Sequence, residues 1–137
     1  FGEAVRWIEQ DIDKKYLYMY KGILVAGLKE RIPEMVINGP EPELGAPHIL
    51  NVSFPGIRGE VMLHALEDKG VYVSTGSACS SRRKSIGPVF QAIGAKKEAA
   101  RGAIRISFSH MNTSDEMYRT IDIFERCFKE LKGYIRR

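Results

Sequence analysis

The stretch Ala-Ile-Arg-Ile-Ser-Phe at residues 103–108 decides the fold class of this chain. Ile104, Ile106 and Phe108 alternate with smaller or polar residues, and a period of two residues is typical of a strand with one buried face. Arg105 then lies on the opposite face. The stretch therefore predicts a half-buried strand whose apolar side is covered by other elements of the domain.

A helix is predicted soon after this strand. Residues 113–116 read Thr-Ser-Asp-Glu, which is the pattern of a capping box at a helix start. Gly133, behind Lys129 and Lys132, predicts the end of the helix. Between these signals the apolar residues recur at helical spacing, and they are Met117, Ile121, Phe124, Phe128 and Leu131.

The rest of the chain predicts further strands and helices. Strands are expected at residues 35–38, 49–54 and 71–73, and helices at residues 1–30, 59–69 and 86–93. This order predicts an α+β two-layer domain with a small mixed or antiparallel sheet and helices on one side. The first helix is longer than a compact domain of this size needs, so residues 1–32 are interpreted as a connector that packs on a missing partner domain, and residues 33–137 as the domain that follows it.

Local signals place individual residues within these elements. In the strand at 49–54, Asn51 and Ser53 are expected to face away from the core. Gly70 fits the left-handed position that closes the helix at 59–69. Ser85 is a candidate N-cap of the helix at 86–93. The residues of helix 59–69 expected to face the core are Val61, Met62, Ala65 and Leu66.

Composition excludes several classes of protein. The 137 residues and 15.5 kDa suit one domain, and the net charge of +4 is spread along the chain without a groove-reading motif, which argues against nucleic-acid binding. No apolar run approaches the roughly 20 residues that span a bilayer. The chain starts at Phe1, without a Met and without a signal-peptide pattern, which suggests a piece of a longer protein.

The cysteines and histidines point to free thiols and to no metal site. Two cysteines make no disulfide framework, and their contexts differ, since Cys127 lies in an amphipathic helix pattern and is expected to be half-buried. Two free thiols favour a reducing cytoplasm. The histidines, which are His48, His64 and His110, have no spacing that indicates metal ligation.

Cys79 is the residue that most suggests chemistry. Residues 74–83 have no apolar periodicity and predict a loop, in which the small neighbours of Cys79 cannot bury its thiol. The basic residues at 82–84 would favour the thiolate, which is the nucleophilic form. From composition alone, a spare thiol in a surface loop is an equally good interpretation.

Several motifs resemble one family in their order. Residues 74–81, Ser-Thr-Gly-Ser-Ala-Cys-Ser-Ser, resemble the catalytic-cysteine loop of cysteine desulfurases, in the class V branch of the pyridoxal-phosphate-dependent aminotransferase superfamily. The resemblance runs from about Asn38 to the last helix and includes Asn-Gly-Pro at 38–40, Ala-Ile-Gly at 92–94 and residues 104–107 ahead of Asn-Thr at 112–113.

The resemblance implies that residues 33–137 are the C-terminal small domain of such an enzyme and residues 1–32 its connector from the missing large domain. It also implies a reaction and a role for several residues. Pyridoxal phosphate would activate L-cysteine, and Cys79 would take its sulfur as a persulfide, leaving L-alanine, for delivery to acceptor proteins of iron–sulfur cluster or tRNA-thiolation pathways. Arg105 would bind the substrate carboxylate; a surface ion pair with a nearby Glu is the alternative. Thr75, Gly76 and Ser77 match positions that contact the cofactor phosphate across the interface of a homodimer.

The chain also departs from the family. It reads Gly-Pro-Val-Phe at 87–90 where many relatives read Ser-His-Val-Leu, which leaves the anchoring of the loop and the acceptor open. The family's cofactor lysine directly follows a histidine, and no histidine here is followed by lysine. We therefore expect this chain alone to be inactive. The alternatives are another class V aminotransferase, a selenocysteine lyase, or a stand-alone sulfur-relay module without a cofactor.

Overall fold

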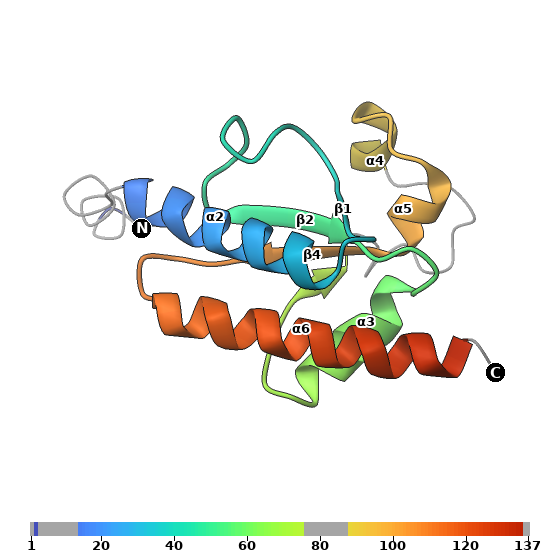
Figure 1. Cartoon of the computed structure of the whole chain (residues 1–137). Coiled ribbons are helices and arrows are strands. Elements are labelled where there is room, and N and C mark those ends of the chain that lie inside the picture. The colour runs from blue at the N-terminus through green and yellow to red at the C-terminus, as the bar shows by residue number, and fades with distance from the viewer. Residues whose placement is uncertain (1, 3–13, 76–87, 136–137) are drawn as a thin grey trace.

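Figure 1 shows the computed structural model of the chain, which describes residue 2 and residues 14–75 and 88–135. The first predicted helix is confirmed from Lys14 on, and its earlier part lies outside the described residues. In chain order the elements are α2 (Lys14–Arg31), β1 (Val36–Ile37), β2 (Ile49–Ser53), α3 (Gly59–Glu67), β3 (Ser74–Thr75), α4 (Pro88–Ala92), α5 (Lys97–Arg101), β4 (Ala103–Ser107) and α6 (Ser114–Ile135).

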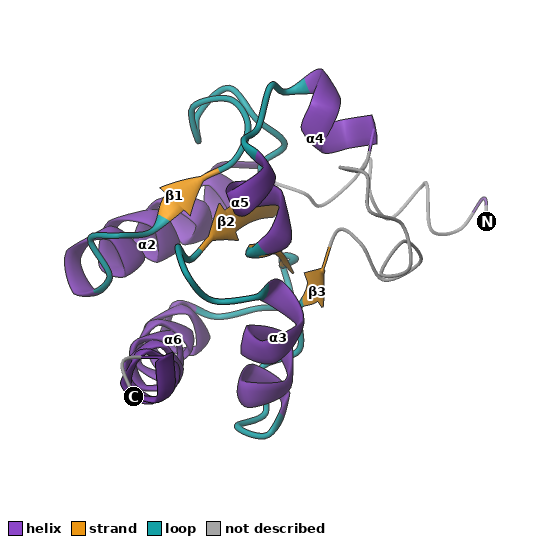
Figure 2. Ribbon diagram, turned by 90° about the vertical axis from the view of Figure 1, so that its right-hand side faces the viewer, coloured by secondary structure: helices purple, strands orange, loops and turns teal. Residues whose placement is uncertain are grey.

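The strands form one antiparallel sheet, and the predicted α+β fold class is confirmed. The strand order is β1-β2-β4-β3, so β4 lies between β2 and β3. Leu50 pairs with Ile106 and Val52 with Ile104, which aligns the apolar side chains of both central strands on one face. The helices α2, α3 and α6 cover this face, and the short α5 lies on the other side of the sheet (Figure 2).

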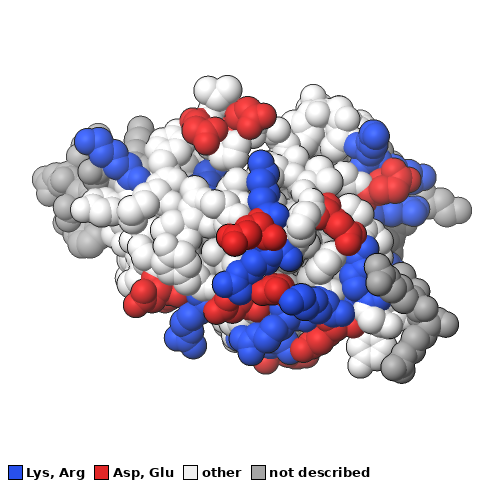
Figure 3. Space-filling view, in the orientation of Figure 1, with Lys and Arg blue, Asp and Glu red and all other residues white. Residues whose placement is uncertain are grey.

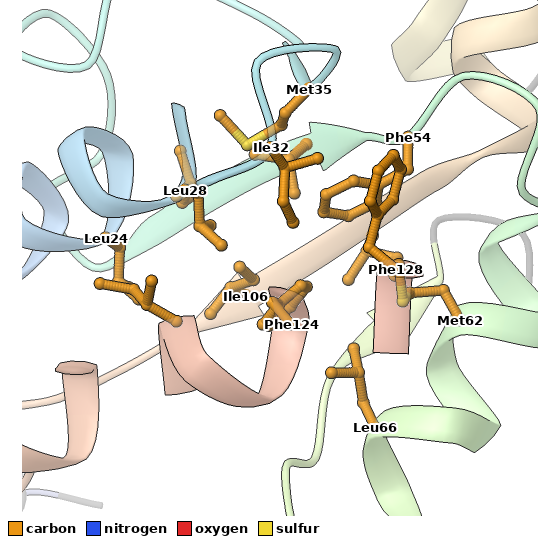
Figure 4. Packing of buried hydrophobic residues seen from close by; sticks show 14 of the residues in the cluster. Leu24, Leu28, Ile32, Met35, Phe54, Met62, Leu66, Ile106, Phe124 and Phe128 are labelled. Carbon is orange, nitrogen blue, oxygen red and sulfur yellow. The ribbon is translucent and has the colours of Figure 1, made fainter. Parts of the chain in front are cut away.

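The hydrophobic core lies between the sheet and these three helices (Figure 4). Leu24 and Leu28 of α2 and Phe124 of α6 are completely buried there. The Phe54 ring, just after β2, packs against Phe124 at a centroid distance of 5.7 Å. Each such side chain contributes about 1.5–3 kcal/mol when it leaves water, so this layer supplies most of the driving force for folding.

The start of α6 is as predicted, but its end is not. The Thr113 backbone N–H donates to Glu116 Oε2 at 2.8 Å, and the Glu116 N–H donates to Thr113 Oγ1 at 3.3 Å, which confirms the capping box. The helix runs through Gly133 to Ile135, so Gly133 does not end it. Lys132 Nζ lies 2.6 Å from Glu34 Oε2, and this ion pair holds the last turns against the loop after α2.

Helix α3 shows a confirmed cap and one wrong assignment. Gly70 has φ +80°, and the Val71 and Gly70 N–H groups donate to the carbonyls of Leu66 and Glu67, which is a Schellman motif. Met62 and Leu66 are completely buried, but Val61 is 45 % exposed. Val61 is not a core residue because α3 packs at the edge of the sheet and buries only one narrow face.

The third predicted strand is displaced along the chain. Residues 71–73 pair with no described strand, and β3 is formed by Ser74 and Thr75, which pair with Arg105 and Ile104. Tyr72 is 78 % exposed, while Val71 and Val73 pack against the core without joining the sheet. The Val-Tyr-Val alternation at residues 71–73 therefore indicates which side chains face the core, and it does not indicate a strand of the sheet.

The segment before β4 contains a helix that the sequence did not predict. Helix α5 is short, largely charged and has no apolar period, so no sequence signal marks it. It contacts β2, where the buried Ser53 hydroxyl donates to the Ala99 carbonyl at 2.6 Å. The helix expected at residues 86–93 is observed as α4, and its candidate cap Ser85 lies outside the described residues.

Two glycines give a matched test of this packing. A Cβ at Gly59 would lie 2.7 Å from the Ala103 carbonyl oxygen, and backbone cannot move aside as a side chain can. We expect Gly59→Ala to lower the free energy of unfolding by about 1–3 kcal/mol. Gly22→Ala, within the exposed middle of α2 where nothing lies within 4 Å, should raise it by about 0.5–1 kcal/mol. Chemical denaturation of both variants measures these changes. Equal changes in the free energy of unfolding would contradict the close contact between Gly59 and the Ala103 carbonyl.

Charges of both signs alternate on the face that carries α2 and α6 (Figure 3). Arg31 Nη1 pairs with Glu125 Oε2 at 2.8 Å and with Asp122, and Glu125 also pairs with Lys129. Hydrogen bonds from Lys129 and Arg31 lower the pKa of Glu125. The described part of this face therefore has no continuous basic stripe. Among the described helices, none combines the length and the apolar character needed to cross a bilayer.

Candidate functional site

The predicted site residues fall into two groups. Cys79, Gly76 and Ser77 lie outside the described residues, so their placement stays a prediction. Arg105 and Thr75 are described, on the paired strands β4 and β3. The described part of the site is therefore the part on the sheet, which ends at Thr75 of β3.

Arg105 lies on the face of the sheet opposite the core, as the strand pattern predicts. Ile104 and Ile106 on either side of it are buried, whereas Arg105 is exposed. Its cross-strand neighbours are Asn51 on β2 and Ser74 on β3. The side chains of Asn38, Asn51, Arg105 and Ser74 form a polar row across the four strands, and we call this row the open face.

The guanidinium of Arg105 has a neutral neighbour. Its Nη2 donates to Ser74 Oγ at 3.3 Å, and no acidic residue of the described chain forms an ion pair with it. The described residues thus give no support to the alternative of a surface pair with Glu. An exposed guanidinium that is not paired with a carboxylate of the protein can bind an external carboxylate by donating two parallel hydrogen bonds to it.

A hydrogen-bond network occupies the β1 end of the open face. Asn38 Nδ2 donates to Asn51 Oδ1 at 2.8 Å and to Ser53 Oγ at 2.6 Å. Ser53 is buried and donates in turn to the Ala99 carbonyl of α5. Sequence reasoning placed Asn51 and Ser53 on this face but gave Asn38, Asn51 and Ser74 no role, because only the strand register brings them to Arg105.

Thr75 lies on the other face. It pairs with Ile104, and directly paired residues point to the same side of a sheet. Its Cγ2 would lie 3.4 Å from a Cβ at Gly59, at the start of α3. The structure therefore brings Ser74, and not the Thr75 side chain, to Arg105. A role for Thr75 toward a cofactor phosphate stays a prediction.

The open face fits a carboxylate better than it fits a pyridoxal ring. A covalent cofactor site needs a lysine, and none belongs to the open face as described. Lys21 is buried elsewhere, where its Nζ donates to the Ala46 carbonyl at 3.0 Å, and burial lowers its pKa. The row that forms the open face thus carries a guanidinium that could bind a carboxylate, and it contains no lysine.

Cys127 is fully buried, which corrects the expectation of a half-buried residue. Its Sγ donates to the Ala65 carbonyl at 3.3 Å, and burial raises the pKa of this thiol above its ordinary value. Both effects keep the sulfur protonated and unreactive. Among the described residues, no group of three or more His, Cys, Asp or Glu side chains could hold a metal ion.

The raised pKa of Cys127 predicts a pH dependence of stability. Between the ordinary thiol pKa of about 8.5 and the raised value, the unfolded chain loses a proton that the folded chain keeps. The free energy of unfolding should therefore fall with rising pH, by up to about 1.4 kcal/mol per pH unit. In Cys127→Ser the hydroxyl does not titrate in this range. The free energy of unfolding, measured by denaturation at a series of pH values from 8 upward, should therefore fall less steeply with pH in this variant. If the free energy of unfolding fell equally steeply with pH in the wild type and in Cys127→Ser, the raised pKa of Cys127 would be refuted.

A separate cavity of about 440 Å³ lies between α2 and α6. Gly22, Ile23 and Ala26 line one wall, and Tyr118 and Ile121 line the other. These helices cover the core face of the sheet, so the cavity does not adjoin the open face that carries Arg105.

Comparisons with known proteins agree with the motifs. The aminotransferase class-V family model matches residues 1–119. The "Cysteine desulfurase IscS" of Clostridium botulinum (strain Hall) is 35% identical over 132 residues, which are 94% of this chain and 33% of that protein. The protein of the same name from Salmonella paratyphi C is 35% identical over 133 residues, 96% of this chain and 32% of its own length.

Solved structures give the same result. A structure titled "NIFS-LIKE PROTEIN" superposes with a TM-score of 0.71 and 32% identity, over 85% of this chain and 28% of that one. A NifS-like protein from Rickettsia africae, with a TM-score of 0.60 and 23% identity over 82% of this chain and 29% of its own, shares the fold. The chain spans about a third of the length of the curated relatives it matches. The chain belongs to the aminotransferase class-V family, and these curated relatives are cysteine desulfurases.

Proposed function

We propose that this chain is the C-terminal small domain of a cysteine desulfurase, with residues 1–32 as the connector from a larger cofactor-binding domain. One observation carries the proposal: β3 pairs with β4 beside Arg105 and then leads to Cys79. Ser74, which contacts Arg105, precedes Cys79 by five residues, and such a span reaches at most roughly 17 Å when fully extended. A substrate held at Arg105 is thus within reach of the Cys79 thiol.

In this proposal each residue has one task. Arg105 holds the carboxylate of L-cysteine through its planar guanidinium, and Ser74 orients that group. The larger domain would hold pyridoxal phosphate, which would supply the electron sink that weakens the carbon–sulfur bond of the substrate. The Cys79 thiolate attacks the substrate sulfur, so a sulfur–sulfur bond forms and the carbon–sulfur bond breaks. The electron pair stays with the carbon, which gains a proton and leaves as L-alanine.

The basic residues after Cys79, at positions 82–84, would stabilise its thiolate. The persulfide on Cys79 is then available to an acceptor protein of an iron–sulfur or tRNA-thiolation pathway. Homodimer formation would bring Thr75, Gly76 and Ser77 to the cofactor phosphate of the partner. These assignments rest on the family motifs and on L-cysteine being the substrate that the relatives' names specify.

The reaction itself tests this function. The complete enzyme, in which this chain is joined to the domain that holds pyridoxal phosphate, should convert L-cysteine to equal amounts of L-alanine and protein-bound sulfur that a thiol releases as sulfide. L-Selenocysteine and simple amino donors are the comparison substrates. Turnover of selenocysteine without cysteine would indicate a selenocysteine lyase, and transamination of an amino acid without sulfur release would indicate another class V enzyme.

A further inference from the structure

A single backbone carbonyl fixes the direction of the hydrogen bonds on the open face. The Ala99 carbonyl of α5 can only accept, so the proton of the Ser53 hydroxyl must point to it. Ser53 Oγ must then accept from Asn38, which identifies the contacting atom of Asn38 as its NH2 group. The second proton of that NH2 group goes to Asn51, whose contacting atom is therefore its carbonyl oxygen.

This chain of bonds leaves the amide NH2 of Asn51 turned away from β1. β2 lies between β1 and β4, so the side opposite Asn38 is the side of Arg105, the direct cross-strand partner of Asn51. No described residue accepts a hydrogen bond from Asn51 Nδ2. Asn51 Nδ2 is thus a half-buried donor with no acceptor among the described residues, and it lies on the strand beside Arg105. The guanidinium of Arg105, which donates to Ser74, forms no ion pair with a described carboxylate.

We propose that Asn51 Nδ2 donates to the substrate carboxylate beside Arg105, and that Asn38 and Ser53 are positioning residues that hold the Asn51 amide in this orientation. The inference rests on the proposed function, since it names a second contact to the same substrate group. The donors of Arg105 and Asn51, on adjacent strands, would select a carboxylate over an amide. A carboxylate offers an acceptor oxygen to each donor, whereas an amide offers one oxygen and an NH2 group, which is itself a donor.

A purely structural role is the alternative. In that case the network only ties β1, β2 and α5 together, and the Asn51 NH2 faces water. Asn51→Asp separates the two interpretations, because the aspartate still accepts from Asn38 Nδ2 while the donor toward Arg105 is replaced by a carboxylate oxygen. Ser107→Asp is the matched control: it adds the same charge on the same face and strand as Arg105, about 7 Å along, and removes no donor.

The first measurement uses kinetics of the complete enzyme. Asn51→Asp should raise KM for L-cysteine about 10- to 100-fold, with a smaller change in kcat. Ser107→Asp should raise KM less than about threefold by long-range repulsion alone. Asn38→Ala, which frees the Asn51 amide to rotate, should fall between them. Equal KM values for Asn51→Asp and Ser107→Asp would overturn the proposal.

The second measurement needs neither turnover nor cofactor. The 15N-labelled wild-type chain is titrated with L-alanine and, separately, with L-alaninamide, which lacks the carboxylate. The NH2 signals of Asn51 and the guanidinium signal of Arg105 should shift together with L-alanine and stay in place with L-alaninamide. A response of Arg105 without Asn51 overturns the inference and leaves the proposed function standing. If the Arg105 signal shows no response that depends on the carboxylate, this result contradicts the proposed function itself.

Discussion

Replacing Cys79 by serine should abolish sulfur transfer in the complete enzyme while leaving substrate binding intact. The hydroxyl is a poor nucleophile toward sulfur and cannot store it, so persulfide formation should fall below detection. Arg105 is unchanged in this variant, so the affinity for L-cysteine should remain near that of the wild type. Sulfide release assays and equilibrium binding of L-cysteine measure the two effects separately.

The chain supplies its own control for this variant. Cys127→Ser removes the other thiol, which is buried and bonded to the Ala65 carbonyl, and should leave sulfur transfer unchanged. If Cys79→Ser retained wild-type transfer to an acceptor protein, or if Cys127→Ser abolished it, the assignment of Cys79 as the sulfur acceptor would be wrong.

Arg105→Ala should act at substrate capture. Loss of a charge-assisted, bidentate contact costs about 2–4 kcal/mol, or roughly 30- to 1000-fold in kcat/KM. Arg105→Lys should recover only part of this, because an ammonium group cannot reproduce the planar fork of two donors. Steady-state kinetics with L-cysteine over a wide concentration range provide the measurement.

Arg58→Ala is the matched control for charge loss. Arg58 is an exposed arginine that pairs with Glu60 two residues away, so its removal should change kcat/KM less than about twofold. A wild-type KM for L-cysteine in Arg105→Ala would show that another residue holds the carboxylate. An equal loss in Arg58→Ala would show that overall charge, and not the geometry of the open face, governs binding.

The parts of the fold that the sequence predicted are those fixed by local periodicity. The alternation at residues 103–108 gave the correct face for Arg105, and the capping box marked the start of α6. The left-handed Gly70 was also predictable, since only glycine takes that conformation without strain. Each of these features depends on residues close together in the chain.

The features that were missed depend on tertiary contacts. β3 forms at Ser74 and Thr75 because β4 supplies its partner there, although the preceding Val-Tyr-Val has the stronger strand pattern. The last helix continues through Gly133, and Lys132 beside it pairs with Glu34, which is 98 residues away in the chain. Likewise, Asn51 could be placed on a face from its strand position, but its contact with Asn38 and its register with Arg105 follow only from the sheet.

The most direct test of the account is the location of the sulfur after one turnover. The complete enzyme is mixed with less than one equivalent of 34S-labelled L-cysteine, alkylated, digested and analysed by mass spectrometry. The account predicts one labelled sulfur on the peptide that contains Cys79, none on the peptide with Cys127, and one L-alanine per labelled site. Label on Cys127, or L-alanine formed with no label on Cys79, would contradict it.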